Sequence, residues 1–352
     1  MKINVLTESL SPGGIGFNVP LREGGKIFKD RKIFFDFFWN DPLDEKLVDC
    51  DCLFINSKVF RTWWGADKKE RMLERYEHFR KRVGKIYYFD TTDSSGTLQA
   101  DLLPYVAAYS KSFLLKNKRA YLKPFYGGRI FTDFYHTRYG VKDQEEITVD
   151  LQKPILEQDL QKLRVSWNSA LTFGSGWKHR ILNIFDNRFT APEKSRPIDL
   201  TCRMTVNHQR ETIRYQRERI AEMLQGRGVK ISKLRKKEYL REMKASKIGV
   251  SPFGWGEFAF RDFEVFKHGC VLLKPDVSHL ETWPDLYRSG ETYANFSWDF
   301  QDFQQVISGL LDDPAKALGI AVNGQNRYKW YVESQEARLQ FCDRITNLVN
   351  EV

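Results

Sequence analysis

The stretch KIGVSPFGWGEFAFRDFEVFKHGCVLLKP, residues 247–275, decides the fold class because it has the pattern of a complete α/β unit. The short apolar run before the proline predicts a buried strand, and the glycines on either side of Trp255 predict a tight turn. Helical periodicity begins near Glu257, Gly269 is typical of a helix end, and the apolar residues after it predict the next strand. This order of elements indicates a parallel sheet with helices packed on it.

Four polar residues of the predicted helix share one face, because they stand at i, i+4, i+7 and i+11: Glu257, Arg261, Glu264 and His268. A solvated helix face explains Glu257 and His268 equally well. Arg261 and Glu264 favour a functional interpretation, because the helix is short and lies between two buried strands. It also starts at a glycine turn, whose free N–H groups suit a phosphate.

This segment resembles the nucleotide-sugar-binding segment of GT-B glycosyltransferases, especially exostosin-like and bacterial surface-polysaccharide enzymes. The resemblance implies that Glu264 binds the ribose of the donor, and that Arg261 and the turn amides face its diphosphate. Many retaining members have two glutamates separated by seven residues, whereas six residues separate Glu257 from Glu264, so Glu257 is the weaker assignment. The residues that carry the resemblance are Ser251, Pro252, Gly254, Gly256, Arg261, Glu264, Gly269 and Pro275.

The resemblance implies an α/β chain with the GT-B fold, in which two Rossmann-like domains face each other across a central cleft. We place an acceptor-binding domain at 1–190, a nucleotide-sugar-binding domain at 191–325, and a C-terminal helix returning to the first domain at 326–352. The polar, proline-bearing stretch 185–199 has no periodicity and predicts the linker. Strands that alternate with helices also predict mostly parallel sheets, whose ligands bind beyond the carboxyl ends of the strands.

The composition is that of a folded protein with anionic partners. The 352 residues suffice for two domains with a core each, and a hydrophobic content of 41% is ordinary for a soluble protein. The formal net charge of +10 favours nucleic acid, phosphate-bearing substrates or an anionic membrane surface as partners. The charge alone does not choose between these classes.

The cysteines and the hydropathy bear on the compartment. Five cysteines are an odd number, so we expect reduced thiols in a cytoplasmic protein. Cys50 and Cys52 form a C-x-C pair without a second cluster, which argues against a zinc site. The start MKINVLTESL predicts a strand, and no run of about 18 apolar residues occurs, so we expect neither a signal peptide nor a membrane span. Any membrane contact would be peripheral.

A glycine-rich segment follows the first predicted strand. It contains Gly13, Gly14 and Gly16, and we expect a flexible loop that approaches a ligand closely. A plain turn explains the glycines equally well, since the dinucleotide spacing G-x-G-x-x-G is absent. The resemblance to GT-B enzymes implies a loop in the cleft.

Three residues of the N-terminal half are candidates for the general base that deprotonates an acceptor hydroxyl. Asp90 and Asp93 follow a predicted strand at its carboxyl end, although carboxylates in such turns are more often capping residues. His136 stands among aromatic residues that suit sugar rings, although a structural role is the more frequent one for such a histidine.

Further donor-binding candidates surround the segment 247–275. Arg203 and Lys274 are candidates to assist Arg261 in holding the diphosphate, and His279 follows a strand at its carboxyl end. Gly254, Trp255 and Gly256 complete the predicted donor-binding turn.

We therefore predict a glycosyltransferase of surface-polysaccharide synthesis that moves a sugar from a nucleotide-sugar to a glycan or lipid-linked acceptor. No cofactor and no metal are expected, because no Asp-x-Asp pair stands in a suitable place. We expect a cytoplasmic protein that docks peripherally on an anionic membrane and binds no nucleic acid. Two alternatives stay open at this point: a nucleic-acid-binding protein, favoured by the charge and by 14% aromatic residues, and a sugar-nucleotide epimerase or phosphorylase on the same fold.

Overall fold

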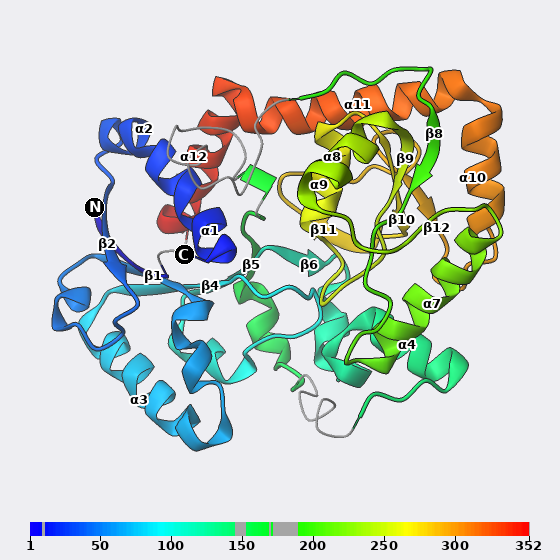
Figure 1. The fold of residues 1–352 in the computed structure, drawn as a ribbon. Coiled ribbons are helices and arrows are strands. Elements are labelled where there is room, and N and C mark those ends of the chain that lie inside the picture. Colours follow the sequence, from blue (N-terminus) through cyan, green and yellow to red (C-terminus); the bar gives the residue numbers. More distant parts are fainter. Residues whose placement is uncertain (9–10, 145–152, 169, 172–188, 352) are drawn as a thin grey trace.

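A computed structural model describes residues 1–8, 11–144, 153–168, 170–171 and 189–351 (Figure 1). Two parallel sheets with helices packed on them form the body of the molecule. The fold class predicted from the sequence, α/β with two Rossmann-like halves, is confirmed.

The first sheet has six strands, all parallel, in the order β2-β1-β3-β4-β5-β7. The chain first runs outward from β1 to β2 and then crosses to the other side of β1, so the direction of winding reverses between β1 and β3. Ligands of such sheets bind at the carboxyl ends of the two strands that flank this reversal. The strands are β1 (Lys2–Thr7), β2 (Phe34–Trp39), β3 (Cys52–Asn56), β4 (Lys85–Asp90), β5 (Ala108–Lys111) and β7 (Leu163–Val165).

The second sheet has four parallel strands in the order β12-β10-β9-β8, and an antiparallel pair, β6 with β11, joins the two halves. In this pair Leu114 of the first half lies opposite Glu281 of the second. The strands are β8 (Ile198–Thr201), β9 (Ser246–Val250), β10 (Val271–Pro275), β12 (Ala294–Phe296), β6 (Phe113–Leu115) and β11 (Leu280–Thr282).

Helices cover both sheets. In the first half these are α1 (Pro12–Glu23), α2 (Gly25–Asp30), α3 (Ala66–Arg82) and α4 (Ile130–Tyr139), with 3-10 turns η1 (Glu45–Val48), η2 (Ser57–Trp63), η3 (Ala100–Tyr105), η4 (Lys118–Leu122), η5 (Tyr126–Gly128) and η6 (Glu157–Lys162). In the second half they are α7 (Glu211–Gln225), α8 (Lys236–Ala245), α9 (Phe260–Lys267), α10 (Phe303–Asp312), α11 (Pro314–Glu333) and α12 (Gln335–Glu351).

The C-terminal helices run from the second half back to the first, as Figure 1 shows along its upper edge. Helix α11 packs on α9 and β10, whereas α12 packs on α1 and α2. The sequence predicts one final helix from Asn326, and this is wrong, because the helix breaks at Ser334. The predicted domain boundaries stay a prediction, and the one at 325/326 falls inside α11.

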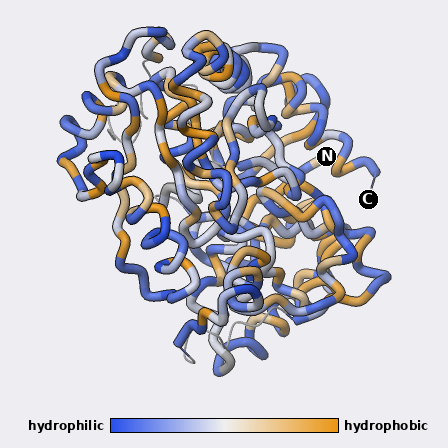
Figure 2. The backbone as a smooth tube through the Cα atoms, turned by 90° about the vertical axis from the view of Figure 1, so that its right-hand side faces the viewer, coloured by the Kyte–Doolittle hydropathy of each residue, from blue (hydrophilic) through white to orange (hydrophobic). Residues whose placement is uncertain are grey.

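The core consists of two clusters of buried apolar side chains on opposite faces of the first sheet. Successive strand residues point to opposite faces, so Leu53 joins the cluster around Tyr76 of α3, while Phe54 joins the cluster around Phe341 of α12. The first cluster continues into the second half of the chain. Figure 2 shows the apolar segments gathered inside and the hydrophilic segments mostly at the periphery.

Two expected elements differ from the structure near the candidate site. The glycine segment predicted as a loop is the first turn of helix α1, because Ser11 accepts a hydrogen bond from the Gly14 amide (2.9 Å) and Pro12 suits the first helical position. Helix α9 starts at Phe260 rather than near Glu257, so Glu257 is not on the same helix as Arg261.

Candidate functional site

A cavity of about 480 Å³ lies between the two halves of the chain. Its lining comes from segments that follow strands at their carboxyl ends, in both sheets, and it includes the reversal between β1 and β3. This is where open parallel sheets bind ligands. The first half contributes Glu8, Ser11, Gly13, Gly16, Phe17, Lys58, Arg61, Thr91, Thr92, Asp93, Ser112, Phe113, Trp167 and Asn168, and the second half contributes Gly254, Trp255, Gly256, Phe258, Ala259, Phe260 and Phe263.

The wall formed by the first half is positively charged where α1 begins. A Cβ added to Gly13 would lie 2.9 Å from the Lys58 ammonium, so that cation lies over the first turn of the helix. Arg61 lines the cavity from the same 3-10 turn as Lys58. Among the described residues neither cation has a carboxylate within 4 Å. A helix N-terminus and two cations together favour an anionic ligand.

Gly14 packs against the backbone of Glu8 and does not line the cavity. A Cβ at this position would lie 2.5 Å from the Glu8 carbonyl oxygen, so only glycine fits there. Of the three predicted loop glycines, the structure therefore brings Gly13 and Gly16 to the cavity, while Gly14 supports the turn.

The turn predicted to bind the donor faces the cavity from the second half. The Gly254 amide donates a hydrogen bond to the Gly256 carbonyl (3.0 Å), which closes the turn around Trp255. A Cβ at Gly256 would lie 1.2 Å from the backbone oxygen of Asp93, so the two halves meet here at a distance that only glycine allows. The Trp255 side chain is 39% exposed, and its ring meets that of His208 edge to face, with centroids 4.8 Å apart.

Glu257 joins the two halves of the chain. Its carboxylate accepts hydrogen bonds from the amide (3.1 Å) and the hydroxyl (2.5 Å) of Ser95, and its side chain is buried. Glu257 does not line the cavity. Both carboxylate oxygens have partners in the first half of the chain, so the structure shows an interdomain contact, and the donor-binding role of Glu257 stays a prediction.

Lys274 is buried and forms its contacts inside the second half of the chain. Its ammonium is fully buried, forms an ion pair with Asp262 (2.7 Å) and donates to the Glu257 carbonyl (2.6 Å). It also lies 5.1 Å from the centroid of the Phe258 ring. These contacts hold Lys274 inside the core, and it does not line the cavity, so the expectation that it assists Arg261 stays a prediction.

Three arginines form a basic cluster behind the donor turn: Arg203, Arg217 and Arg261. Neither these arginines nor Glu264 line the cavity itself. Arg261 donates to the Arg203 carbonyl, and the Arg217 guanidinium would lie 3.4 Å from a Cβ at Gly254. Arg203 forms an ion pair with Glu242, whereas among the described residues Arg217 has no ion pair. Burial, followed by the charge of Arg261, lowers the pKa of Arg217. The cluster thus carries positive charge that an anion next to the turn would neutralise.

Glu264 lies at the edge of the basic cluster. It accepts a hydrogen bond from the Tyr239 hydroxyl (2.8 Å), and burial raises the pKa of the Glu264 carboxyl. Arg261 lies close enough to lower that pKa in part. A half-buried carboxylate held by a tyrosine can accept hydrogen bonds from the hydroxyl groups of a sugar.

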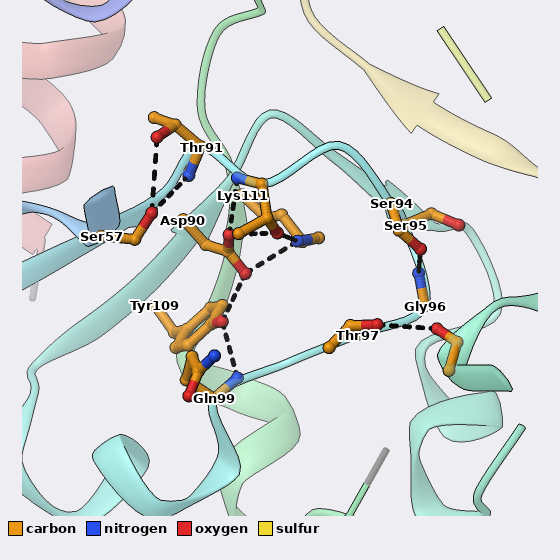
Figure 3. A network of polar contacts seen from close by, with 12 residues as sticks. Ser57, Asp90, Thr91, Ser94, Ser95, Gly96, Thr97, Gln99, Tyr109 and Lys111 are labelled. Carbon is orange, nitrogen blue, oxygen red and sulfur yellow. Dashed lines mark hydrogen bonds and ion pairs between the residues drawn. The ribbon is translucent and has the colours of Figure 1, made fainter. Parts of the chain in front are cut away.

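Asp90 is the centre of a buried network (Figure 3) and does not line the cavity. The Lys111 ammonium donates to it at 2.7 Å and the Tyr109 hydroxyl at 2.6 Å, and both Asp90 and Lys111 are fully buried. Thr92 donates from its amide and its hydroxyl. Lys111 and these hydrogen bonds outweigh burial and lower the pKa of Asp90. Both Asp90 oxygens accept hydrogen bonds from these groups, so the structure gives no support to the predicted role of general base for Asp90.

The other two candidate bases, Asp93 and His136, lie in different surroundings. Asp93 is exposed and lines the cavity. His136 lies on α4, stacked on the Tyr126 ring with centroids 3.6 Å apart, and its Nδ1 is 2.9 Å from the Val141 carbonyl oxygen. His136 is outside the cavity lining, so the structure supports a packing role for it.

His279 also lies outside the cavity lining. Its ring meets the Trp298 ring edge to face, with centroids 5.1 Å apart, and burial lowers its pKa. Its backbone carbonyl accepts a hydrogen bond from the Lys116 amide (2.9 Å), so it lies directly beside the strand pair that joins the two halves. The structure does not bring it to the donor turn.

His208 gives a testable pH dependence. Burial, followed by Arg217, Arg210 and Arg129, lowers its pKa from 6.5 to about 4. Between these values the unfolded chain binds more protons than the folded one, so this histidine makes the fold less stable as the pH falls from 6.5 to 4. We expect the melting temperature of His208→Gln to fall less over this range than that of the wild type. Identical pH profiles for the two proteins would contradict this, and His78→Gln is the control.

No group of three or more His, Cys, Asp or Glu residues that could hold a metal ion occurs within the described part of the chain. The chain also has no helix there that is long and apolar enough to cross a membrane.

Strands of both sheets therefore point with their carboxyl ends toward one cavity, and the last helix returns to the first half. The chain has the GT-B arrangement. No family model and no curated protein matches the sequence. Solved structures with a similar fold include Anabaena Alr3699/HepE in complex with UDP, at 13% identity, a TM-score of 0.48 and coverage of 100% of both chains. The lipopolysaccharide outer core galactosyltransferase WaaB has 10% identity, a TM-score of 0.48 and coverage of 99% of both chains. Because these scores are low, the fold assignment rests on the topology of the chain itself.

Proposed function

We propose that this chain is a glycosyltransferase that moves a sugar from a nucleotide-sugar donor to a hydroxyl group of a glycan or lipid-linked acceptor. One observation carries the proposal: the cavity lies at the carboxyl ends of strands from two parallel sheets, two cations line its first-half wall, and three arginines stand behind the turn that forms its other wall. Lys58 and Arg61 line one wall, and the basic cluster stands behind the other. A nucleotide-sugar fits this setting, because its diphosphate is anionic and its two ends need separate binding surfaces.

The departing diphosphate gains negative charge in the transition state, and fixed positive groups lower the energy of that charge. In our proposal Arg261 and Arg217 supply this charge from behind the donor turn, and the turn amides add hydrogen bonds. Glu264, held by Tyr239, accepts hydrogen bonds from the ribose hydroxyl groups. Trp255 is exposed at the cavity and offers a flat apolar face beside this site.

The acceptor site lies on the first half of the chain in this proposal. Asp93 is the exposed carboxylate among the predicted bases that line the cavity, so we assign it the removal of the proton from the acceptor hydroxyl. Asn168 supports a polar ligand here as well: it lines the cavity, and its buried Nδ2 has no hydrogen-bond partner among the described residues. A sugar hydroxyl could accept that hydrogen bond.

We further propose that the reaction needs no metal ion, because the arginines and helix amides replace its charge. The cytoplasmic side of a membrane and surface-polysaccharide synthesis remain the proposed setting, with anionic lipid attracting the net charge of +10. Activity that is unchanged by EDTA is the result expected from this part of the proposal.

The products distinguish this function from its alternatives. The purified protein is incubated with a panel of nucleotide-sugars, with and without saccharide acceptors, and the products are separated by chromatography and mass spectrometry. A transferase releases a nucleoside diphosphate and lengthens an acceptor. An isomeric nucleotide-sugar formed without acceptor would identify an epimerase instead, and salt-sensitive binding of oligonucleotides alone would support the nucleic-acid alternative.

A further inference from the structure

A second cavity, of about 240 Å³, lies on the first half of the chain beneath helix α12. Strands β4 and β5 and the segment after β7 form its floor, and α12 forms its side. Trp167 lines both this cavity and the interdomain cavity, so the two cavities are neighbours. The proposed transfer reaction assigns no role to a ligand in this cavity.

Apolar side chains of helix α12 form one part of the lining. Phe341, Ile345 and Leu348 stand at i, i+4 and i+7 of α12, so they form one stripe about 10 Å long. Trp167 and Trp283 add two large rings. An empty apolar cavity of about 150 Å³ holds a benzene molecule, so a space of about 240 Å³ beside this stripe has room for an alkyl chain.

A buried hydroxyl in the same cavity has no partner. Ser110 is 1% exposed, and its Oγ makes no hydrogen bond to any described residue. Because side chains alternate along β5, Ser110 points to the sheet face that carries Phe89, whereas Tyr109 and Lys111 point to the other. Buried polar groups without a partner are rare in folded proteins, since each costs free energy, and they mark places where a ligand or a water completes the contact.

The lining also includes two cations and one carboxylate. Arg344 lies 5.1 Å from the centroid of the Trp283 ring and donates to the Val165 carbonyl (2.8 Å). Arg164 and Glu351 complete the charged lining. Among the described residues neither arginine has an ion pair, and the described lining has two positive charges and one negative charge.

We infer that this cavity is a binding site for the alkyl chain of an amphiphile with an anionic headgroup. The chain lies along the stripe of α12, and Arg164 and Arg344 bind the headgroup. Ser110 gives a hydrogen bond to an oxygen of the ligand or to a water that accompanies it. The inference does not depend on the proposed transferase activity.

Isothermal titration of the full chain with octyl phosphate, below its aggregation limit, tests the inference. The wild type is expected to bind saturably, whereas inorganic phosphate alone binds at least ten times more weakly. Leu348→Trp fills the cavity and is expected to weaken octyl phosphate binding at least tenfold. Leu339→Trp, a substitution of the same kind at an exposed position on α12, keeps wild-type binding.

Ser110→Ala provides a second variant that keeps the fold, because it removes only a hydroxyl without a partner. We expect it to bind octyl phosphate at least threefold more weakly, with a melting temperature equal to or above that of the wild type. Unchanged binding by Leu348→Trp, or no saturable binding by the wild type, would overturn the inference. Nucleotide binding is a separate readout, measured on the wild type and on Leu348→Trp. If neither protein binds a nucleotide, that result contradicts the proposed function alone.

Discussion

Turnover is expected to fall about 10²- to 10³-fold when Arg261 is replaced by alanine, which corresponds to about 3–4 kcal/mol of transition-state stabilisation. Arg261 stands in the first turn of α9, directly after the donor turn, and together with Arg217 it supplies the positive charge behind that turn. The loss is expected mainly in kcat, because the charge on the diphosphate grows as the bond to the sugar breaks.

Folding is expected to survive this change. In the folded chain the Arg261 guanidinium donates to the Arg203 carbonyl, and Arg203 itself remains fixed by its ion pair with Glu242. Arg219→Ala is the matched control, since Arg219 lies on α7 in the same half and pairs with Glu222 at the surface (2.6 Å). Wild-type turnover in Arg261→Ala, measured with the donor saturating, would remove Arg261 from the reaction.

The free energy of unfolding is expected to fall by about 3–5 kcal/mol in Lys111→Met. The variant removes the ammonium but leaves the Asp90 carboxylate buried, with hydrogen bonds from Tyr109 and Thr92 alone. In the wild type the pKa of Asp90 lies below 3.8, so its ionised form is favoured in the folded state. Without Lys111 this charge has no counterion, and burying an unpaired charge is costly.

Urea denaturation at pH 7 measures the effect, and the double variant Lys111→Met with Asp90→Asn is the control. We expect the double variant to be more stable than Lys111→Met, because the uncompensated charge is gone. Exposed ion pairs contribute below about 1 kcal/mol. If the free energy of unfolding of Lys111→Met falls by no more than that, the buried network does not stabilise the carboxyl ends of β4 and β5.

The fold was predictable because its signals are local. Residues 247–275 contain a strand, a turn, a helix end and a second strand in sequence order, and the structure has β9, α9 and β10 there. The signal at α1 was also present, since Ser11 before Pro12 is typical of a helix start, but the three glycines, with their low helix propensity, outweighed it. Tertiary packing then stabilises a helix that propensity alone disfavours.

The site was predictable only in part, because tertiary partners decide which charges remain available. Asp90 and Lys274 have suitable positions in the sequence, yet Lys111 and Asp262 hold them in the core. No local pattern shows such pairs. Lys58, by contrast, lines the cavity and was not predicted. It follows β3 at its carboxyl end, next to the reversal of the sheet. Applying the rule for parallel sheets to every strand would have found it.

Trp167 and Asn168 carried no recognisable motif. They follow β7, a strand of only three residues. This strand pairs with β5, which lies more than fifty positions earlier in the chain. So short a strand gives no periodicity from which to place the residues after it. Only the folded sheet brings them to the cavity beside Asp93.

Nucleotide binding tests the central claim most directly. The purified chain and Glu264→Gln are melted with UDP, GDP, CDP, ADP, dTDP and CMP, without added metal. We expect one nucleotide to raise the melting temperature of the wild type, since a ligand at 100 times its Kd stabilises the folded state by about 2.7 kcal/mol. Glu264→Gln is expected to melt cooperatively and to lose that shift. If no nucleotide shifts the wild type, the interdomain cavity is not a nucleotide-sugar site and the proposed transfer is wrong.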